Sequence, residues 1–105
     1  RPSFQQLTIN EGKGTPCIFH RVGKELIFIL EGLCSVWCKD LLGKQETYTI
    51  GSNKGLYVPS FILHTFNAQI ASKLLIMSDI EFEMGRDTYD TYSSTIFREL
   101  QNKMK

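Results

Sequence analysis

Two histidines and one glutamate are the residues of this 105-residue chain whose types and spacing are best suited to chemistry. His20 and Glu25 are close in sequence, and His64 is the only other histidine. An imidazole exchanges a proton near neutral pH, and a neighbouring carboxylate stabilises its charged form. The same three side chains also make a two-histidine, one-carboxylate set, which suits Fe(II) or another divalent metal. The residues therefore indicate proton transfer or metal binding.

Each of these residues also has a purely structural interpretation. His20 can be a histidine that is hydrogen-bonded within a β-barrel for structural reasons, and His64 can be a strand-end histidine that is merely partly exposed. Glu25 can form a salt bridge with Arg21 or Lys24, because a lone buried carboxylate is costly unless it is paired or metal-bound. These alternatives stay open at the level of sequence.

The elements that must position these residues are short β-rich segments separated by clusters of Gly, Asn, Asp or Lys. Many short strands at this spacing are typical of a sandwich or barrel. We expect one domain over 1–105, with a barrel over 1–92 and a C-terminal helix and tail over 93–105. The expected strands are Phe4–Ile9, Pro16–Val22, Glu25–Leu30, Leu33–Lys39, Gln45–Ile50, Leu56–Pro59, Leu63–Ala68 and Lys73–Asp79.

Three local patterns refine this expectation. Glu25–Leu30 carries apolar residues on both alternating faces, which predicts a strand buried on both sides. Pro59 marks an edge or the end of a strand. Ser93 or Ser94 can cap a helix over Thr95–Lys103, and the residues expected on its apolar side are Ile96, Leu100 and Phe97.

The alternation of side chains along strands predicts how the two histidines and the glutamate come together. A strand–turn–strand hairpin directs alternate side chains into the barrel, so His20 and Glu25 are expected at its mouth. His64 would join them from a separate strand.

Composition excludes several classes of function. The net charge is +1 and the basic residues are scattered, so no nucleic-acid-binding surface is predicted. The longest strongly apolar stretch, Leu26–Leu30, is far shorter than the ~20 residues that a membrane-spanning helix needs. Arg1–Phe4 lack the pattern of a signal peptide. We therefore expect no nucleic-acid partner and no membrane segment.

The cysteines indicate a reducing compartment. Their number, three, is odd, and they show no CxxC spacing. Cys34 and Cys38 would lie about 13 Å apart on one strand, too far for a disulfide. Reduced thiols and a cytoplasmic protein are the prediction.

Two segments resemble the signature segments of the cupins. Gly12, His20, Glu25 and Gly32 fit the spacing of the first segment, with Ile18 at its first histidine position. In the second segment Pro59 and His64 keep their separation, while Phe61 replaces a glycine. The resemblance implies an all-β cupin (RmlC-like) jelly-roll barrel with a short C-terminal helix.

A narrower resemblance extends over roughly residues 12–92. Lys24–Val36 looks like a strand pair of the WxcM-like family, the nucleotide-sugar 3,4-ketoisomerases. Asn53–Pro59, with the sequence NKGLYVP, is similar to that family's NKGLYIPP segment. Leu74–Ser78 resembles its LLVLAS strand, and Asp87–Tyr92 its acidic, tyrosine-rich tail.

The family resemblance implies an activity and a partner. Family members convert a dTDP-linked 4-keto-6-deoxyhexose to its 3-keto form without metal, for surface polysaccharides. By this likeness His20 and His64 would be catalytic, and Arg21, Glu25 and Tyr57 would bind substrate. No cofactor would be needed, the partner would be a nucleotide-linked sugar, and a homodimer formed by exchange of N-terminal strands is expected.

Two departures from the family pattern keep other functions open. Thr15 stands at the family's arginine and Ile18 at its first histidine. A relative that binds the sugar nucleotide without turning it over is therefore one alternative. A metal cupin that uses His20, Glu25 and His64 with a divalent cation is the other.

Overall fold

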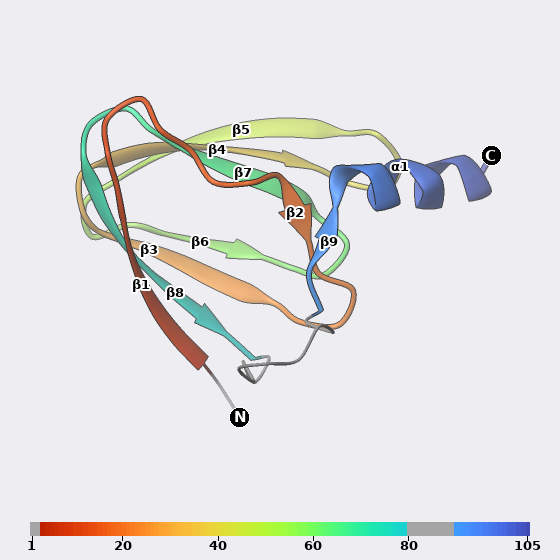
Figure 1. Cartoon of the computed structure of the whole chain (residues 1–105), viewed down its shortest axis with the longest axis horizontal. Coiled ribbons are helices and arrows are strands. Elements are labelled where there is room, and N and C mark those ends of the chain that lie inside the picture. The colour runs from red at the N-terminus through yellow and green to blue at the C-terminus, as the bar shows by residue number, and fades with distance from the viewer. Residues whose placement is uncertain (1–2, 80–89) are drawn as a thin grey trace.

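The described part of the chain folds into two antiparallel β-sheets that face each other, with a helix at the C-terminus (Figure 1). The computed structural model describes residues 3–79 and 90–105. Four strands have the order β1-β8-β3-β6, and five have the order β5-β4-β7-β2-β9. The bounds are β1 Ser3–Ile9, β2 Ile18–Phe19, β3 Glu25–Glu31, β4 Leu33–Lys39, β5 Gln45–Gly51, β6 Gly55–Val58, β7 Leu63–Ala68, β8 Ser72–Ser78, β9 Tyr92–Ser93 and α1 Ser94–Lys103.

The core lies between the two sheets and follows the alternation of the strands. Ile27 and Ile29 of β3 are fully buried, as are Cys34 and Val36 of β4. Alternate residues of a strand point to opposite faces, so these side chains all point inward. The side chains of each sheet therefore pack against those of the other.

A second apolar cluster lies around the helix. Phe97 of α1 packs edge-on against Phe19 of β2, with ring centroids 5.1 Å apart. Leu63 completes the buried part of this cluster. The residue after Phe19 is His20, so the helix packs directly behind one residue of the predicted site.

A glycine forms the passage from one sheet to the other. Gly32 lies between β3 and β4 with φ +118°, a backbone conformation that residues with a Cβ rarely adopt. A Cβ at this position would lie 2.2 Å from Ser72 Oγ and 2.7 Å from Ser72 Cα. Both the conformation and the space therefore require glycine.

Several strand predictions are corrected by the structure. The segment Pro16–Val22 contributes only Ile18–Phe19 as strand, and Tyr92–Ser93 form a strand that the sequence pattern did not indicate. Burial of Glu25–Leu30 on both faces is wrong, because Leu26 and Leu30 are 38% and 40% exposed. Within residues 3–79 and 90–105, a sheet packs against the inner face of β3 and none against its outer face.

The prediction for the helix is confirmed in position and cap. Ser93 is the N-cap, and its Oγ accepts a hydrogen bond from the Ile96 backbone N–H. The apolar side is centred on Phe97, which is buried, whereas Ile96 is 36% exposed, so its assignment to that side was wrong. No helix in the described ranges has the length and apolar character needed to span a membrane.

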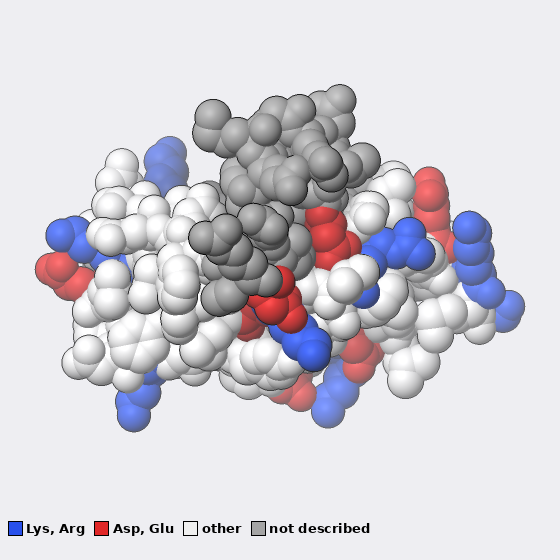
Figure 2. Space-filling view, turned by 90° about the horizontal axis from the view of Figure 1, so that it is seen from below, with Lys and Arg blue, Asp and Glu red and all other residues white. Residues whose placement is uncertain are grey.

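Charged side chains are mixed on the visible surface. On the face shown in Figure 2, lysine and arginine side chains lie beside aspartate and glutamate side chains. This arrangement agrees with the near-zero net charge and gives that face no basic patch.

Candidate active site

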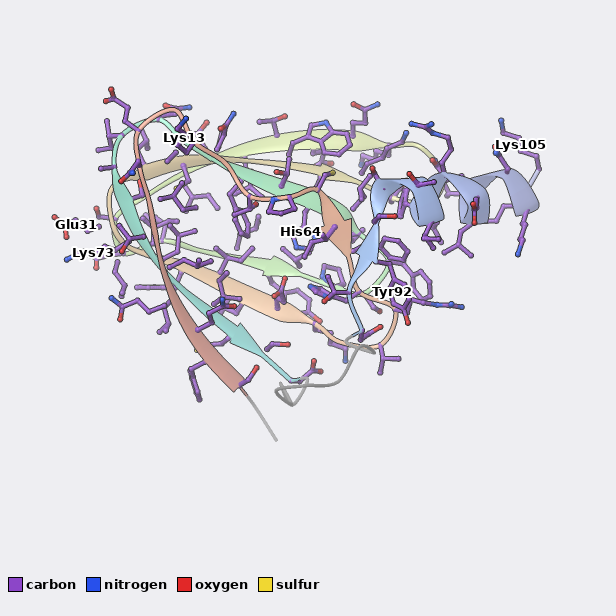
Figure 3. The ribbon with its side chains drawn as sticks, in the orientation of Figure 1. Lys13, Glu31, His64, Lys73, Tyr92 and Lys105 are labelled. Atoms are coloured by element: carbon purple, nitrogen blue, oxygen red, sulfur yellow. The ribbon has the colours of Figure 1, made fainter. Side chains whose placement is uncertain are left out.

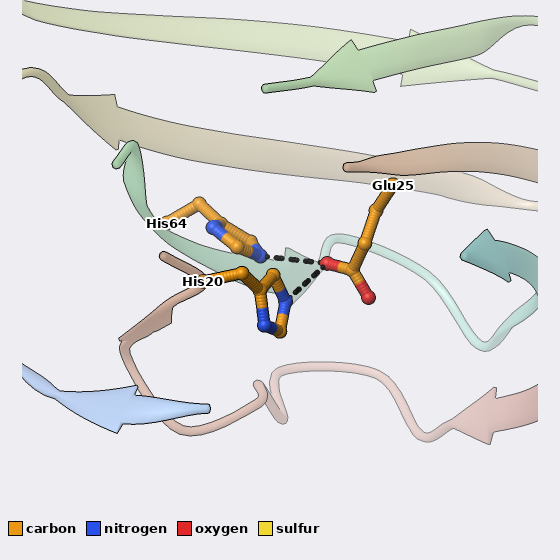
Figure 4. Close-up of side chains that lie close together, drawn as sticks. All are labelled: His20, Glu25 and His64. Carbon is orange, nitrogen blue, oxygen red and sulfur yellow. Dashed lines mark hydrogen bonds and ion pairs between the residues drawn. The ribbon is translucent and has the colours of Figure 1, made fainter. Parts of the chain in front are cut away.

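His20, Glu25 and His64 meet inside the fold (Figure 4). Glu25 Oε1 lies 2.9 Å from His20 Nε2 and 3.1 Å from His64 Nε2. Their side chains are almost buried, at 6% exposure for His20, 12% for Glu25 and 2% for His64. The glutamate pairs with both imidazoles, as a shared partner, rather than with a surface cation. We call these three residues the triad.

Both sheets contribute to the triad. Glu25 begins β3 of the four-stranded sheet, opposite the buried Val58 of β6. His64 lies in β7 of the five-stranded sheet, where Figure 3 labels it, and His20 directly follows β2 of that sheet. Their inward direction follows from strand alternation, which is the signal that the sequence provided.

Hydrogen bonds to the backbone fix the tautomer of each histidine. His20 Nδ1 lies 2.6 Å from the carbonyl oxygen of Asp90, and His64 Nδ1 lies 2.8 Å from that of Ile62. A carbonyl only accepts, so each Nδ1 carries a proton and donates it. Each ring therefore turns its Nε2 toward Glu25 Oε1, and the carboxylate accepts a hydrogen bond when that Nε2 carries a proton.

The charges of the triad are strongly coupled. Burial alone would raise the pKa of Glu25, but the hydrogen bonds and charges of His20 and His64 outweigh it and lower the pKa to about 2. Burial alone would lower the pKa of His20, but the negative charge of the Glu25 carboxylate 2.9 Å away, helped by Asp90, raises it. The carboxylate thus favours the protonated form of His20.

The same geometry fits a metal ion. One ligand atom from each triad residue can be chosen so that all lie within 4.8 Å of one another. Among the described residues, His20 Nε2 is a buried atom with no hydrogen-bond partner of acceptable geometry, although Glu25 Oε1 is near. Two imidazole nitrogens and a carboxylate oxygen are a ligand set for a divalent cation. The donor set and the unsatisfied nitrogen both fit a bound cation.

Asp90 holds the loop that carries His20, a role that no sequence pattern indicated. Its carboxylate accepts hydrogen bonds from the backbone N–H groups of Arg21, Val22 and Gly23, at 2.8, 2.7 and 2.7 Å. Its own carbonyl accepts from His20. One residue therefore fixes both the path of this loop and the orientation of the imidazole.

Two predicted substrate contacts lie apart from the triad. Arg21 is exposed, and its guanidinium carbon lies 5.6 Å from the centre of the Tyr92 ring. Tyr57 is 56% exposed and lies opposite Leu26. Because its neighbour Val58 points inward, Tyr57 points to the outer side of the sheet.

The two positions that depart from the family pattern have local roles. Thr15 Oγ1 accepts a hydrogen bond from the Phe66 backbone N–H, and the Thr15 carbonyl oxygen accepts one from the Thr65 hydroxyl. Ile18 lies directly opposite His64 in the sheet, so an apolar side chain adjoins that histidine. Residues 87–89 of the tyrosine-rich tail lie outside the described residues, and Tyr92 packs on Phe19 with centroids 5.4 Å apart.

Comparison with known proteins gives similarity in structure only. No family model and no curated protein matches the sequence. Among solved structures, the TDP-quinovose 3,4-ketoisomerase WlaRB of Campylobacter jejuni has a TM-score of 0.79 at 12% identity, over 95% of this chain and 74% of that one. QdtA, a sugar 3,4-ketoisomerase of Thermoanaerobacterium thermosaccharolyticum in complex with TDP, has a TM-score of 0.77 at 11% identity, over 99% and 74%.

A third neighbour belongs to a much longer protein. The capsular polysaccharide assembling protein CapF of Staphylococcus aureus has a TM-score of 0.79 at 12% identity, over 89% of this chain. The chain spans about a quarter of CapF, 26% of its length. At these identities the likeness establishes the fold, which is the cupin jelly roll that the sequence predicted.

Proposed function

We propose that this chain is a sugar-modifying cupin that acts as a 3,4-ketoisomerase on a dTDP-linked 4-keto-6-deoxyhexose, for surface polysaccharide biosynthesis. The observation that carries the proposal is the buried triad, in which two imidazoles share one carboxylate oxygen. The WxcM-like motif around Gly55–Pro59 and the likeness in fold to two sugar ketoisomerases support the choice of substrate.

The triad has the parts that this isomerisation needs. In its neutral form, His20 would accept the proton from C3 of the keto sugar at Nε2, which leaves an enediolate. Glu25 stabilises the imidazolium that forms. The imidazolium of His20 would return its proton to C4, and His64, as the second polar group, would assist the transfer of the hydroxyl proton from O3 to O4. The net change moves the carbonyl from C4 to C3 with no change in redox state.

Proton abstraction can be tested separately from complete turnover. We expect the protein to exchange deuterium into C3 of dTDP-4-keto-6-deoxyglucose in D2O, as measured by proton NMR. His20→Asn should abolish the exchange, whereas Glu31→Gln, which alters a surface carboxylate 3.8 Å from Lys73 Nζ, should not. Binding of the sugar nucleotide with no exchange would contradict catalysis and favour the non-catalytic alternative, in which Thr15 and Ile18 replace the family's polar residues.

A divalent metal centre is the second candidate function, favoured by the unsatisfied His20 Nε2. His20, Glu25 and His64 would hold the cation, which when bound would supply a Lewis acid for a substrate oxygen. Elemental analysis of the purified protein tests this directly. About one metal ion per chain, lost in His64→Asn, would favour the metal centre over the metal-free isomerase.

We also infer a homodimer and a cytoplasmic location. Phe4, Met77, Leu26 and Tyr57 form one row across all four strands of their sheet, on its outer face. Phe4 is 65% exposed, and such a contiguous apolar surface is typical of an interface. The three cysteines are free, which agrees with a reducing compartment. Analytical ultracentrifugation of the wild type and of Leu26→Lys tests the dimer, which the lysine should weaken.

A further inference from the structure

A pocket lies between the two sheets, where their edge strands β5 and β6 are unpaired with each other. Its volume is about 260 Å³. Its residues come from β4, from the hairpin after it, from β5, and from β6 with the turn that follows. The lining consists of Cys38, Lys39, Asp40, Lys44, Glu46, Tyr48, Leu56, Tyr57, Val58, Pro59 and Ile62.

The inner wall of this pocket adjoins the triad. Val58 lies directly opposite Glu25 in the β3–β6 pair, and Cys38 lies directly opposite His64 in the β4–β7 pair. The carbonyl of Ile62, another lining residue, accepts the Nδ1–H of His64. A molecule in the pocket therefore contacts the cross-strand neighbours of Glu25 and His64, although the lining contains no triad residue itself.

The outer wall carries a polar network. Lys44 Nζ lies 3.2 Å from Glu46 Oε1, and the Tyr48 hydroxyl donates to Glu46 Oε2. Glu46 lies opposite Cys38, and Tyr48 lies opposite the buried Val36. Both therefore belong to the inward-pointing set of β5. Each carboxylate oxygen of Glu46 is thus held in place by a different neighbour.

Charge and size restrict what the pocket can hold. Lys39 and Lys44 are balanced by Asp40 and Glu46, so the lining has no excess positive charge for a diphosphate. The remaining lining is largely apolar. Ammonium, carboxylate and phenol groups together donate to and accept from hydroxyl groups. The volume lies just below the ~300 Å³ where typical ligand pockets begin, so it suits one ring rather than a whole nucleotide sugar.

We propose that this pocket receives the uncharged, hydroxylated ring of the substrate, and that Glu46, held by Lys44 and Tyr48, selects the sugar through its hydroxyl groups. The inference rests on the proposed sugar-nucleotide function and deepens it. The ring lies against this network, one strand away from Glu25 and His64, and the diphosphate lies outside the pocket. Glu46 is then a specificity-determining residue of the hairpin strand β5.

Calorimetric titration with dTDP and with dTDP-glucose separates the ring from the nucleotide. We expect the wild type to bind dTDP-glucose more tightly than dTDP. Glu46→Gln and Tyr48→Phe should each reduce the affinity for dTDP-glucose by about five- to tenfold, the effect of one lost hydrogen bond. Their affinity for dTDP should not change. Glu31→Gln, a matched surface carboxylate beside a lysine, should bind both ligands as the wild type does.

The outcomes distinguish this inference from the proposed function. Wild-type preference for dTDP-glucose that survives in both pocket variants would overturn the role of the pocket and leave the function standing. An equal loss of affinity for both ligands would overturn it as well, because it would place the nucleotide at Glu46. A wild type that binds neither ligand would overturn both. Circular dichroism confirms that each variant is folded.

Discussion

Replacing Asp90 by alanine should disturb His20 more than any other part of the site. The substitution removes the carboxylate that accepts three backbone N–H groups from residues 21–23. It keeps the carbonyl that accepts the Nδ1–H of His20, but that carbonyl loses its anchorage. The variant therefore keeps the carbonyl oxygen that accepts from His20 but removes the contacts that hold this oxygen in place.

The magnitude follows from the surroundings of the three hydrogen bonds. A hydrogen bond to a charged group contributes about 1.5–3 kcal/mol to stability, less where water can replace the partner. The hydrogen bonds from the N–H groups of Arg21 and Val22 are exposed to solvent, whereas Gly23, which donates the third, is a buried residue. We therefore expect Asp90→Ala to lower the free energy of unfolding by about 2–3 kcal/mol. The pKa of His20 should fall, because Asp90 helps to raise it.

Two measurements test this reasoning. Urea unfolding gives the stability, and nitrogen-15 NMR of the imidazoles gives the tautomer and pKa of each histidine. His64 is an internal control, because its Nδ1–H binds Ile62. Asp79→Ala is the matched variant, since Asp79 accepts one N–H, from Lys24, at 2.7 Å. If Asp90→Ala unfolds more easily while His20 keeps its tautomer and pKa, Asp90 only tethers the loop and the argument is refuted.

Three further predictions concern pH, backbone and packing. The pKa of Glu25 falls from 4.5 in the unfolded chain to about 2 in the fold. Ionised Glu25 therefore adds about 3 kcal/mol to the free energy of unfolding above pH 4.5, and this stabilisation is lost as the pH falls toward 2. The pKa of His20 is raised above 6.5, so its contribution is present below pH 6.5 and lost as the pH rises through the folded value. Chemical unfolding in EDTA across this range should therefore show greatest stability between about pH 4.5 and 6.5, and Glu25→Gln should remove the acid limb. Gly32→Ala should lower the free energy of unfolding by about 3 kcal/mol or more, because the added Cβ would overlap Ser72. Gly43→Ala has open space at a comparable positive φ and should cost about 1 kcal/mol. Equal losses in the two variants would show that the space around Gly32 plays no part. Phe97→Ala should lower the free energy of unfolding by about 3–5 kcal/mol, measured by thermal or urea unfolding, because the residue is 1% exposed. Ile96→Ala should cost far less. The reverse order would mean that the helix packs by another face.

The sequence predicted the fold and the meeting of the triad because both depend on alternation and on motif spacing. Glu25 and His64 lie on inward positions of strands that were identified from local pattern, and His20 directly follows the short strand β2. The burial of both faces of Glu25–Leu30 failed because an apolar residue on the outer face of a sheet looks the same in sequence as one in the core. Leu26 is such a residue.

The residues that sequence reasoning missed act across long separations or in an exposed hairpin. Asp90 contacts a loop 67 to 69 positions earlier, and no spacing rule connects them. Glu46 shares the face of Tyr48 in the alternating segment Gln45–Ile50, so its inward position could have been read. The ion pair between Glu46 and Lys44 could not be predicted, because it depends on the geometry of the turn.

The triad joins the two sheets, and this has a consequence for the order of events in folding. Glu25 comes from one sheet and both histidines come from the other, so their contacts form only after the sheets have docked. Such contacts are expected to be weak in the transition state, with small φ-values. Substitution of Glu25 should then accelerate unfolding much more than it slows refolding in stopped-flow experiments. The triad thus contributes to how long the folded state persists once formed, and a ligand that bridges the same residues would lengthen that lifetime.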